Sequence, residues 1–264
     1  MNVGEPFYLA LLKAIHDSHS DLLNPIPLDL LILGFVIEQN NSTGGISFWE
    51  RCDNQSVADG HGISLVDYIH AMYFFLRQKK CRHVLMIGCG GGTLATMLRR
   101  AGVKVTIADI DGRNFEIART YFHMPGDVEC HIADGRDFLR RDPRRYDAIV
   151  LDAYCDNTMP KHFLKRAFFE LVKSRLKARN AMVLVNLMAT GENDRGPDRF
   201  ARLMRKTWRQ VRLLDSKGYD GRNVVAAAGC VRKLKRPKLV LRPQRCAKKM
   251  AAELRAMDFR RLWA

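Results

Sequence analysis

The stretch from His83 to Asp111 constrains the fold more than any other part of the chain. A short apolar run, Val84–Ile87, is followed by a glycine-rich turn, a helical pattern and a second apolar run that ends in Asp109. Glycines lack β-carbons and let a ligand approach the backbone, and the helix behind them offers unpaired N–H groups. A carboxylate at the end of the second strand can accept hydrogen bonds from a ribose diol. This order of elements predicts half of a nucleotide-binding α/β domain.

The length and composition of the chain fit one large α/β domain with a small appendage. A chain of 264 residues can bury a sizeable core, and a hydrophobic fraction of 47% is ordinary for a globular protein. No apolar run reaches the ~20 residues that a membrane span needs, so we expect no membrane partner. The seven cysteines contain no Cys-x-x-Cys pair, which favours free thiols. With no secretory signal pattern, these features predict a cytoplasmic protein.

The positive charge of the chain is concentrated in its last part. The formal net charge is +16, and residues 161–264 hold 28 Lys and Arg against 8 Asp and Glu. Such a surface suits RNA or a membrane, but basic side chains on solvated helix faces give the same composition. No aromatic residues alternate with the basic ones over 232–245, as a base-stacking platform would require. Nucleic acid is therefore an alternative partner that the sequence does not favour.

Residues 1–80 predict an N-terminal appendage of helix and short β-strands. Phe7–His16 has the spacing of an amphipathic helix, and the alternation in Ile46–Arg51 indicates a small β-region. A capping-box pattern starts the helix that is predicted over Leu65–Gln78 and leads into the main domain.

From His83 onward, apolar strands alternate with helices, a pattern that predicts a parallel sheet covered on both faces. In chain order these segments are Val84–Gly88, Leu94–Arg100, Val103–Ala108, Asn114–Tyr121, Val128–Ile132, Tyr146–Leu151, Lys161–Lys177, Ala181–Leu187 and Asp198–Arg209. Val211–Asp215 and Val224–Ala228 follow too closely for a crossover helix, so they should form an antiparallel hairpin. The predicted class is α/β, a Rossmann-like class I methyltransferase sheet of five parallel strands plus a terminal hairpin, over 81–230.

A basic C-terminal segment, 231–264, is predicted to pack on this nucleoside-binding domain. Lys238–Leu241 predicts an edge strand. Cys246–Leu262 has apolar residues at helical spacing and predicts an amphipathic helix.

In open parallel sheets, ligands bind outside the carboxyl ends of the strands. The predicted cofactor-binding residues at these ends are Gly88, Gly90, Gly92, Asp109, Ile110, Asp134 and Gly135. Asp109 is the expected ribose acceptor, with a plain helix-capping acid as the alternative. Asp134 suits the exocyclic amine of adenine, although Asp-Gly is also a common turn.

The fourth strand end carries two acids, Asp152 and Asp156. Paired carboxylates can hold a cationic amine by charge-assisted hydrogen bonds. One of them can also take the proton that an amine loses before it attacks carbon. In the alternative reading, Asp152 caps the loop and Asp156 faces water.

These residues resemble the spermidine synthases, or polyamine aminopropyltransferases, and their spermidine synthase-like relatives. The similarity covers roughly residues 35–228 and is strongest in VLMIGCGGG, ADID, ADGRDFL and the stretch that begins YDAIVLDAYCDNTMP. The resemblance implies that Asp109 binds the ribose of decarboxylated S-adenosylmethionine and that Asp134 with Gly135 contacts adenine. It also implies that Asp152 activates the attacking amine and that Asp156 helps to hold the polyamine.

Two tyrosines complete the predicted site. Tyr68, in DYIHAM, resembles the family's Y-[HQ]-E-M and is expected to line the substrate pocket. Tyr154 is expected to help Asp156 orient the cationic acceptor. No metal site is predicted, and the resemblance implies a homodimer.

The sequence departs from the family pattern in three places. The family's loop is usually GGGDGG, whose Asp grips the aminopropyl amine, and Gly91 stands in that place here. The second acid, Asp156, is displaced by one residue, and Ile69 follows the tyrosine in place of Gln or His. The nucleoside pocket is therefore better supported than the aminopropyl pocket.

The leading hypothesis is aminopropyl transfer from decarboxylated S-adenosylmethionine to a small diamine such as putrescine. The runner-up is an S-adenosylmethionine-dependent methyltransferase with an anionic or RNA substrate, because a donor that keeps its carboxylate tolerates Gly91 better than an acid. A non-catalytic nucleoside-binding relative is the third hypothesis. A dinucleotide oxidoreductase is weaker, since Thr93 replaces the third glycine of that fingerprint.

Overall fold

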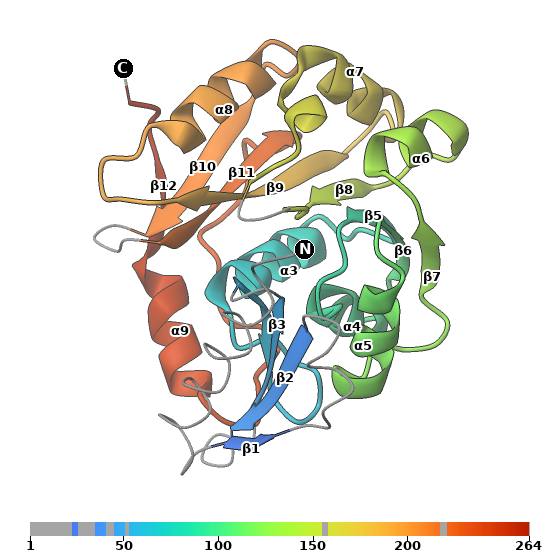
Figure 1. The fold of residues 1–264 in the computed structure, drawn as a ribbon. Helices are drawn as coiled ribbons and strands as arrows, with labels where there is room; N and C mark the ends of the chain where they lie inside the picture. Colours follow the sequence, from blue (N-terminus) through green and yellow to red (C-terminus); the bar gives the residue numbers. More distant parts are fainter. Residues whose placement is uncertain are drawn as a thin grey trace, which may run out of the picture.

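The computed structural model describes residues 23–25, 35–40, 45–50, 53–154, 158–216 and 221–263. An eight-stranded sheet with helices on both faces forms the main body, and a four-stranded sheet lies beside it (Figure 1). The strand order in the main sheet is β12-β10-β11-β9-β8-β5-β6-β7.

The centre of the main sheet is parallel, as predicted. Its parallel strands are β7 (Glu129–Ile132), β6 (Lys104–Asp109), β5 (His83–Ile87), β8 (Ala148–Leu151) and β9 (Met182–Ala189). The predicted hairpin follows as two antiparallel strands, β11 (Arg222–Gly229) and β10 (Val211–Ser216). The Rossmann-like class I sheet is thus confirmed, and its carboxyl edge lies at the ends of β5, β6, β7 and β8.

Each face of the sheet is covered by its own helices (Figure 1). One face carries α3 (Asp67–Gln78), α4 (Thr93–Arg100), α5 (Arg113–Tyr121) and α9 (Ala247–Ala256). The other carries α6 (Gly135–Arg141), η1 (Lys161–Leu164), α7 (Arg166–Ser174) and α8 (Gly196–Arg205). Alternate residues of each strand point to opposite faces, so Val84 and Met86 join the first core while Leu85 and Ile87 join the second.

The four-stranded sheet is antiparallel and packs on the main body through α5. Its strands are β1 (Leu23–Pro25), β2 (Phe35–Asn40), β3 (Gly45–Glu50) and β4 (Asp53–Ala58). Buried Phe48 and Ile37 contact a small core completed by Phe122, just after α5. The β-region predicted around Ile46 is a strand of this sheet, whereas the helix predicted over Phe7–His16 lies outside the described residues.

The predicted capping box at the start of α3 is wrong. The helix begins at Asp67, and Val66 at the N-cap makes no side-chain capping bond. Ser64 Oγ instead accepts the N–H of Val66 at 3.1 Å, and Asp67 Oδ1 accepts the N–H of Tyr68 at 2.7 Å. Each side chain therefore bonds to a backbone N–H one or two residues ahead of it. Neither bond is the reciprocal one that defines a capping box.

The C-terminal segment also differs from the prediction. The helix α9 ends at Ala256, and β12 (Met257–Arg260) pairs antiparallel with β10 as the edge strand. The predicted edge strand Lys238–Leu241 has no regular structure. Pro237 precedes it and cannot donate to a ladder, whereas Arg260 brings a guanidinium to two buried acids, Asp215 of β10 and Asp198 of α8.

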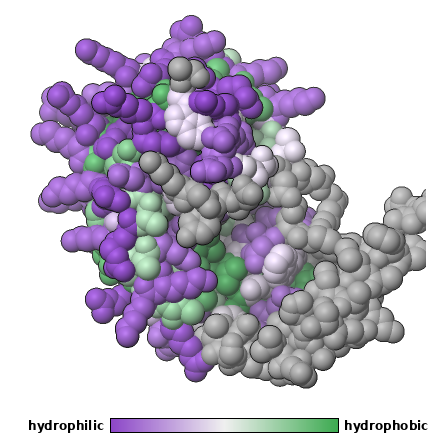
Figure 2. Space-filling view, turned by 90° about the vertical axis from the view of Figure 1, so that its left-hand side faces the viewer, coloured by the Kyte–Doolittle hydropathy of each residue, from purple (hydrophilic) through white to green (hydrophobic). Residues whose placement is uncertain are grey.

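The side of the molecule that carries α9 is dominated by hydrophilic side chains in its described part (Figure 2). No helix within the described ranges combines the length and the apolar character that crossing a membrane requires. The division of the chain at residues 80 and 230 stays a prediction.

Candidate active site

The glycine turn after β5 is shaped by the strand end beside it. Gly88 has a φ of 96°, and a β-carbon there would lie 2.0 Å from the carbonyl oxygen of Asp152. Only glycine fits this backbone and this approach. The turn then enters α4 through Gly92, which caps the helix in a left-handed conformation. The loop is therefore built against the end of β8.

Asp109 ties the end of β6 to the same turn. Its Oδ2 accepts the N–H of Cys89 at 2.7 Å, and its Oδ1 accepts the N–H of Asp111 at 2.9 Å. The side-chain amide of Asn114 adds a longer bond of 3.3 Å. Burial raises the pKa of Asp109, and these hydrogen bonds oppose the rise. Each carboxylate oxygen has two acceptor sites, so the group can hold the loop and still accept a bond from a ligand hydroxyl.

Two large apolar side chains are exposed next to this acid, one following it in the chain and one paired with it in the sheet. Ile110, the predicted cofactor contact, is 67% exposed, and Ile132 at the end of β7 is 72% exposed. Isolated exposed apolar side chains are ordinary on a protein surface. Here two of them lie at the adjacent ends of β6 and β7, beside the acid that bonds to the glycine turn.

Asp134 follows β7 and is the N-cap of α6, a short helix that the sequence did not predict. Its Oδ1 accepts the N–H groups of Arg136 and Asp137 at 2.9 and 3.1 Å. Its Oδ2 lies 2.9 Å from Nε2 of His162, at ion-pair distance, although Nε2 lacks an aligned hydrogen-bond partner among the described residues. One oxygen of Asp134 thus caps the helix, and the other lies beside His162.

Gly135, the other predicted adenine contact, has a packing role. A β-carbon at Gly135 would lie 2.2 Å from Cγ2 of Ile87. Its lack of a side chain lets α6 begin directly against the end of β5.

Asp152, at the end of β8, is held by side chains from two other elements. Tyr68 of α3 donates its hydroxyl to Oδ2 at 3.0 Å, and Asn186 of β9 donates its amide N–H to Oδ1 at 2.9 Å. Asp152 as a whole residue is half-buried, and desolvation by the surrounding protein raises the pKa of its carboxylate. The two hydrogen bonds oppose that rise because they favour the charged form.

Tyr154 braces the same strand end. Its hydroxyl donates to the carbonyl oxygen of Asn186 at 2.9 Å and accepts the N–H of Met188 at 3.1 Å. Burial raises the pKa of Tyr154, and the charge of Asp152 adds to that rise, so the phenol stays protonated at neutral pH. Asp156 lies outside the described residues.

Sequence reasoning missed Asn186 and Ser56. The amide Oδ1 of Asn186 is buried without a hydrogen-bond partner among the described residues, and the only sequence signal was a polar residue inside an apolar strand run. Ser56 of β4 accepts the N–H of Gly91 at 2.8 Å through Oγ. A β-carbon on Gly91 would lie 2.8 Å from Cβ of Ser56. The small sheet therefore fills the space that a side chain at Gly91 needs.

The strand ends meet at one place in the molecule. The N–H of Asp152 bonds to the carbonyl of Ile87, and the N–H of Gly88 bonds to that of Ala108. Asp109 and Asp152 thus lie at the ends of β6 and β8, the two strands that flank β5 and its glycine turn, and Asp134 lies one strand beyond β6, after β7.

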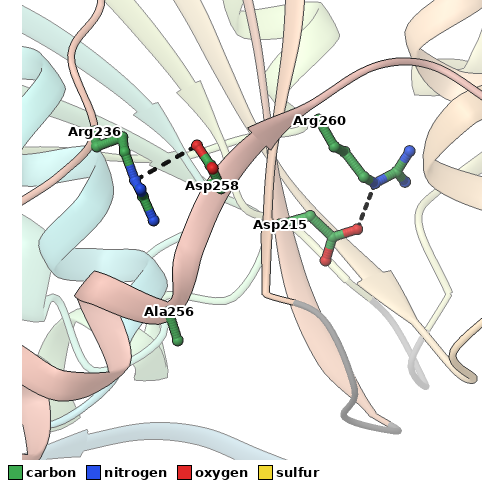
Figure 3. A pocket seen from close by; sticks show the side chains of 5 residues that line it. All are labelled: Asp215, Arg236, Ala256, Asp258 and Arg260. Carbon is green, nitrogen blue, oxygen red and sulfur yellow. Dashed lines mark hydrogen bonds and ion pairs between the residues drawn. The ribbon is translucent and has the colours of Figure 1, made fainter.

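Two cavities lie away from this edge. One of about 240 Å³ is lined by Asp215, Arg236, Ala256, Asp258 and Arg260 (Figure 3). Another of about 280 Å³ lies between the small sheet and α9. Neither cavity is lined by the strand-end residues described above. The candidate site is therefore identified by the chemistry of those residues and not by a cavity. Within the described ranges, no cluster of three or more His, Cys, Asp or Glu side chains has a metal-binding arrangement.

Comparison with known proteins gives three informative matches. A family model described as a methyltransferase domain matches residues 84–177. A probable polyamine aminopropyl transferase of Bifidobacterium longum is 33% identical over 41% of this chain and 25% of its own length. Polyamine aminopropyltransferase 2 of Pseudomonas aeruginosa is 32% identical over 52% of this chain and 42% of its own length. The matches thus span less than half of each of these relatives.

The solved structures extend the likeness to most of the chain. The crystal structure of a probable spermidine synthase from Corynebacterium glutamicum superposes with a TM-score of 0.69 at 17% identity, over 86% of this chain and 87% of that one. The chain has the spermidine synthase-like fold. This fold is the class I methyltransferase sheet predicted above, preceded by a small β-sheet.

Proposed function

We propose that this protein with a spermidine synthase-like fold is a transferase that binds a sulfonium adenosyl donor and alkylates an amine. The specific reaction proposed is aminopropyl transfer from decarboxylated S-adenosylmethionine to a small diamine. The observation that carries the proposal is the position of Asp152. This carboxylate is held by Tyr68 and Asn186 directly beside the glycine turn, where a proton acceptor and a nucleoside site adjoin.

The residues at the neighbouring strand ends fit the adenosyl part of such a donor. Asp109 has acceptor capacity for a ribose diol, and Ile110 and Ile132 offer an apolar surface for adenine. The oxygen of Asp134 that does not cap α6 lies 2.9 Å from Nε2 of His162, and it suits the exocyclic amine. The bare backbone at Gly88 and Gly90 lets the donor lie against the chain.

The proposed reaction requires the protein to position the donor and the amine and to accept one proton from that amine. A sulfonium makes its neighbouring carbon electrophilic. The neutral amine of the acceptor attacks that carbon, the carbon–sulfur bond breaks, and methylthioadenosine leaves with the bonding electron pair. Asp152 takes the amine proton, and its raised pKa makes it a stronger base than an exposed aspartate. Most of the acceleration would come from holding the two reactants together.

The acceptor pocket is proposed to lie around Tyr68 and Tyr154, with Asp156 as a second anionic group for the cation. Tyr154 is firmly held by two bonds to β9, so its ring makes a rigid wall. A homodimer in the cytoplasm remains our prediction from the sequence.

Methyl transfer from S-adenosylmethionine is the second candidate, favoured by Gly91. The family's loop acid would grip an aminopropyl amine, but the space for a side chain at Gly91 is filled by Ser56. A donor that retains its carboxylate meets no opposing acid there.

Calorimetry with three ligands tests the proposal. We expect methylthioadenosine to bind more tightly than S-adenosylhomocysteine, and NAD not to bind. A preference for S-adenosylhomocysteine would overturn aminopropyl transfer in favour of methyl transfer, and binding of neither would overturn the nucleoside site. Asp109→Ala should abolish binding of both.

Asp152→Asn separates binding from chemistry. This variant should keep nucleoside affinity and lose turnover, by roughly 100-fold or more, because the base is gone. The control Asp258→Asn removes an exposed acid far from the site and should keep both. Unchanged turnover in Asp152→Asn would refute the role of this residue.

A further inference from the structure

The segment after β11 carries charge that the proposed transfer reaction does not use. Residues 231–245, here named the basic strap, run irregularly from β11 to the start of α9. Together with α9, over 231–256, the strap holds ten Lys and Arg and one acid, Glu253. The strap begins beside Ala181, at the amino end of β9, opposite to the sheet edge that carries Asp152.

The strap is fixed to the body by hydrogen bonds along its length. Gln78 at the end of α3 donates to the carbonyl of Lys233 at 3.0 Å and accepts the N–H of Lys235 at 3.1 Å. Arg212 of β10 donates to the carbonyl of Leu234 at 2.7 Å. At the far end, the N–H of Gln244 bonds to Asp59 Oδ2 at 2.9 Å. In each of these bonds the strap contributes a backbone group and not one of its basic side chains.

Buried apolar residues alternate with exposed basic residues in the first half of the strap. Val231, Leu234 and Pro237 are buried at every third position. The intervening residues Arg232, Lys233, Lys235, Arg236 and Lys238 are all exposed. The strap thus covers the core with one side and presents a row of cations on the other.

Few of these cations are neutralised. Arg236 lies 3.5 Å from Asp258 (Figure 3), and Lys249 lies 3.8 Å from Glu253. No acid within the described ranges pairs with Arg232, Lys233, Lys235, Lys238, Arg242, Lys248 or Arg255. Like charges gathered on a fixed frame repel one another, and a polyanion relieves that repulsion.

We propose that the strap and α9 form a docking surface for the phosphate backbone of a nucleic acid. Arg and Lys bind phosphate by charge-assisted hydrogen bonds. The strap and α9 contain no aromatic residue, so bases are not stacked and binding is independent of sequence.

The direction of the apolar side chains favours nucleic acid over a membrane. A membrane-binding segment turns large apolar side chains outward into the lipid. Here the apolar residues of the strap turn inward, and Val240 is its one exposed large apolar side chain among the described residues. The surface therefore presents basic side chains but no group of apolar side chains that would insert into lipid.

The test is a salt series with a short labelled duplex RNA, measured by fluorescence anisotropy. If the seven cations without acid partners each neutralise one phosphate, the logarithm of the association constant falls against the logarithm of salt with a slope of about −6. A second duplex of unrelated sequence should bind equally well.

Matched variants locate the surface. Lys233→Gln, Lys235→Gln and Lys238→Gln together should make the slope shallower by between about 2 and 3, because three phosphate contacts are lost. The control replaces Arg205, Lys206 and Arg209 by Gln. These are three exposed cations at the end of α8, on the opposite face of the sheet, and their loss should leave the slope unchanged. Methylthioadenosine binding, if present in the parent protein, and the melting temperature report whether both variants are folded.

Three results would overturn the proposal. Equal loss in both variants would mean that net charge alone attracts RNA. Absence of RNA binding at low salt would rule the surface out. Binding to phosphatidylserine vesicles without RNA binding would assign the strap to a membrane instead. None of these outcomes depends on which group the transferase moves.

Discussion

At the scale of single residues, the candidate base is defined by its neighbours. Asp152 receives one hydrogen bond from α3 and one from β9, so both its oxygens are oriented by the main body. Burial raises its pKa, and the two donors limit that rise. A carboxylate with this balance is more basic than a solvated one.

Tyr68→Phe tests this balance. Removing the hydroxyl takes away a bond that favours the charged form, so the pKa of Asp152 should rise further. Because the ionised base is the active form, the acidic limb of the kcat/KM profile should move to higher pH. Tyr73→Phe, which removes another α3 hydroxyl, is the control. A limb that stays in place would show that Tyr68 does not tune Asp152.

Gly91 and Ser56 form a second residue-scale pair. Gly91→Ala places a β-carbon 2.8 Å from Cβ of Ser56, and such overpacking should lower the free energy of unfolding by about 1 to 3 kcal/mol. Adding Ser56→Gly removes that clash and should restore part of the loss. Urea unfolding measures both variants, and equal stability of the single and double variants would contradict the steric account.

At the scale of elements, β12 is locked by buried ion pairs. Arg260 donates to both oxygens of Asp198 and to Asp215, which also pairs with Arg222. Burial alone would raise the pKa of Asp198, but the bonds from Arg260 and the N–H of Trp263 outweigh it and lower the pKa. These contacts explain why the chain leaves α9 and becomes an edge strand.

Arg260→Ala should therefore be strongly destabilising. It leaves two buried carboxylates short of a partner, which costs about 3 to 5 kcal/mol. Arg236→Ala breaks a pair whose side chains are 56% and 59% exposed and should cost less than about 1 kcal/mol. The lowered pKa of Asp198 also means that its stabilisation is present above its unfolded pKa and is lost as pH falls through the folded one. Chemical denaturation of both variants, repeated from neutral to acidic pH, checks the order and the sign.

At the scale of the whole molecule, the basic residues of the strap and the acids of the candidate site lie in different regions. The acids of the candidate site lie at the carboxyl edge of the sheet, while the basic strap starts at the opposite edge. A net charge of +16 destabilises the compact state through self-repulsion.

Salt should therefore raise the melting temperature. At an ionic strength near 0.15 M the Debye length is about 8 Å, so repulsion between exposed cations is screened while buried pairs are little affected. The strap variant with three glutamines should show a smaller salt effect than the parent in calorimetric melting. A melting temperature that falls on adding sodium chloride would contradict this picture.

The sequence alone determined the central sheet and the order in which the glycine turn and the acids follow its strands. Apolar runs, glycines and terminal acids are local signals, and a parallel sheet brings its strand ends to one edge by geometry. The hairpin was equally readable, because eight residues are too few for a crossover. The local pattern is therefore sufficient to place Asp109, Asp134 and Asp152 at that edge.

Only the tertiary structure decided which side chains hold those acids and where the chain ends its sheet. Tyr68 and Asn186 reach Asp152 across 84 and 34 residues, and Ser56 reaches Gly91 across 35, distances that no local pattern encodes. The C-terminal residues 257–260 fit a helical pattern, but buried Asp198 and Asp215 offer Arg260 partners that a helix would not reach. Long-range pairing of buried charge overrode local periodicity there, because an unpaired charge in the core costs more than a lost turn of helix.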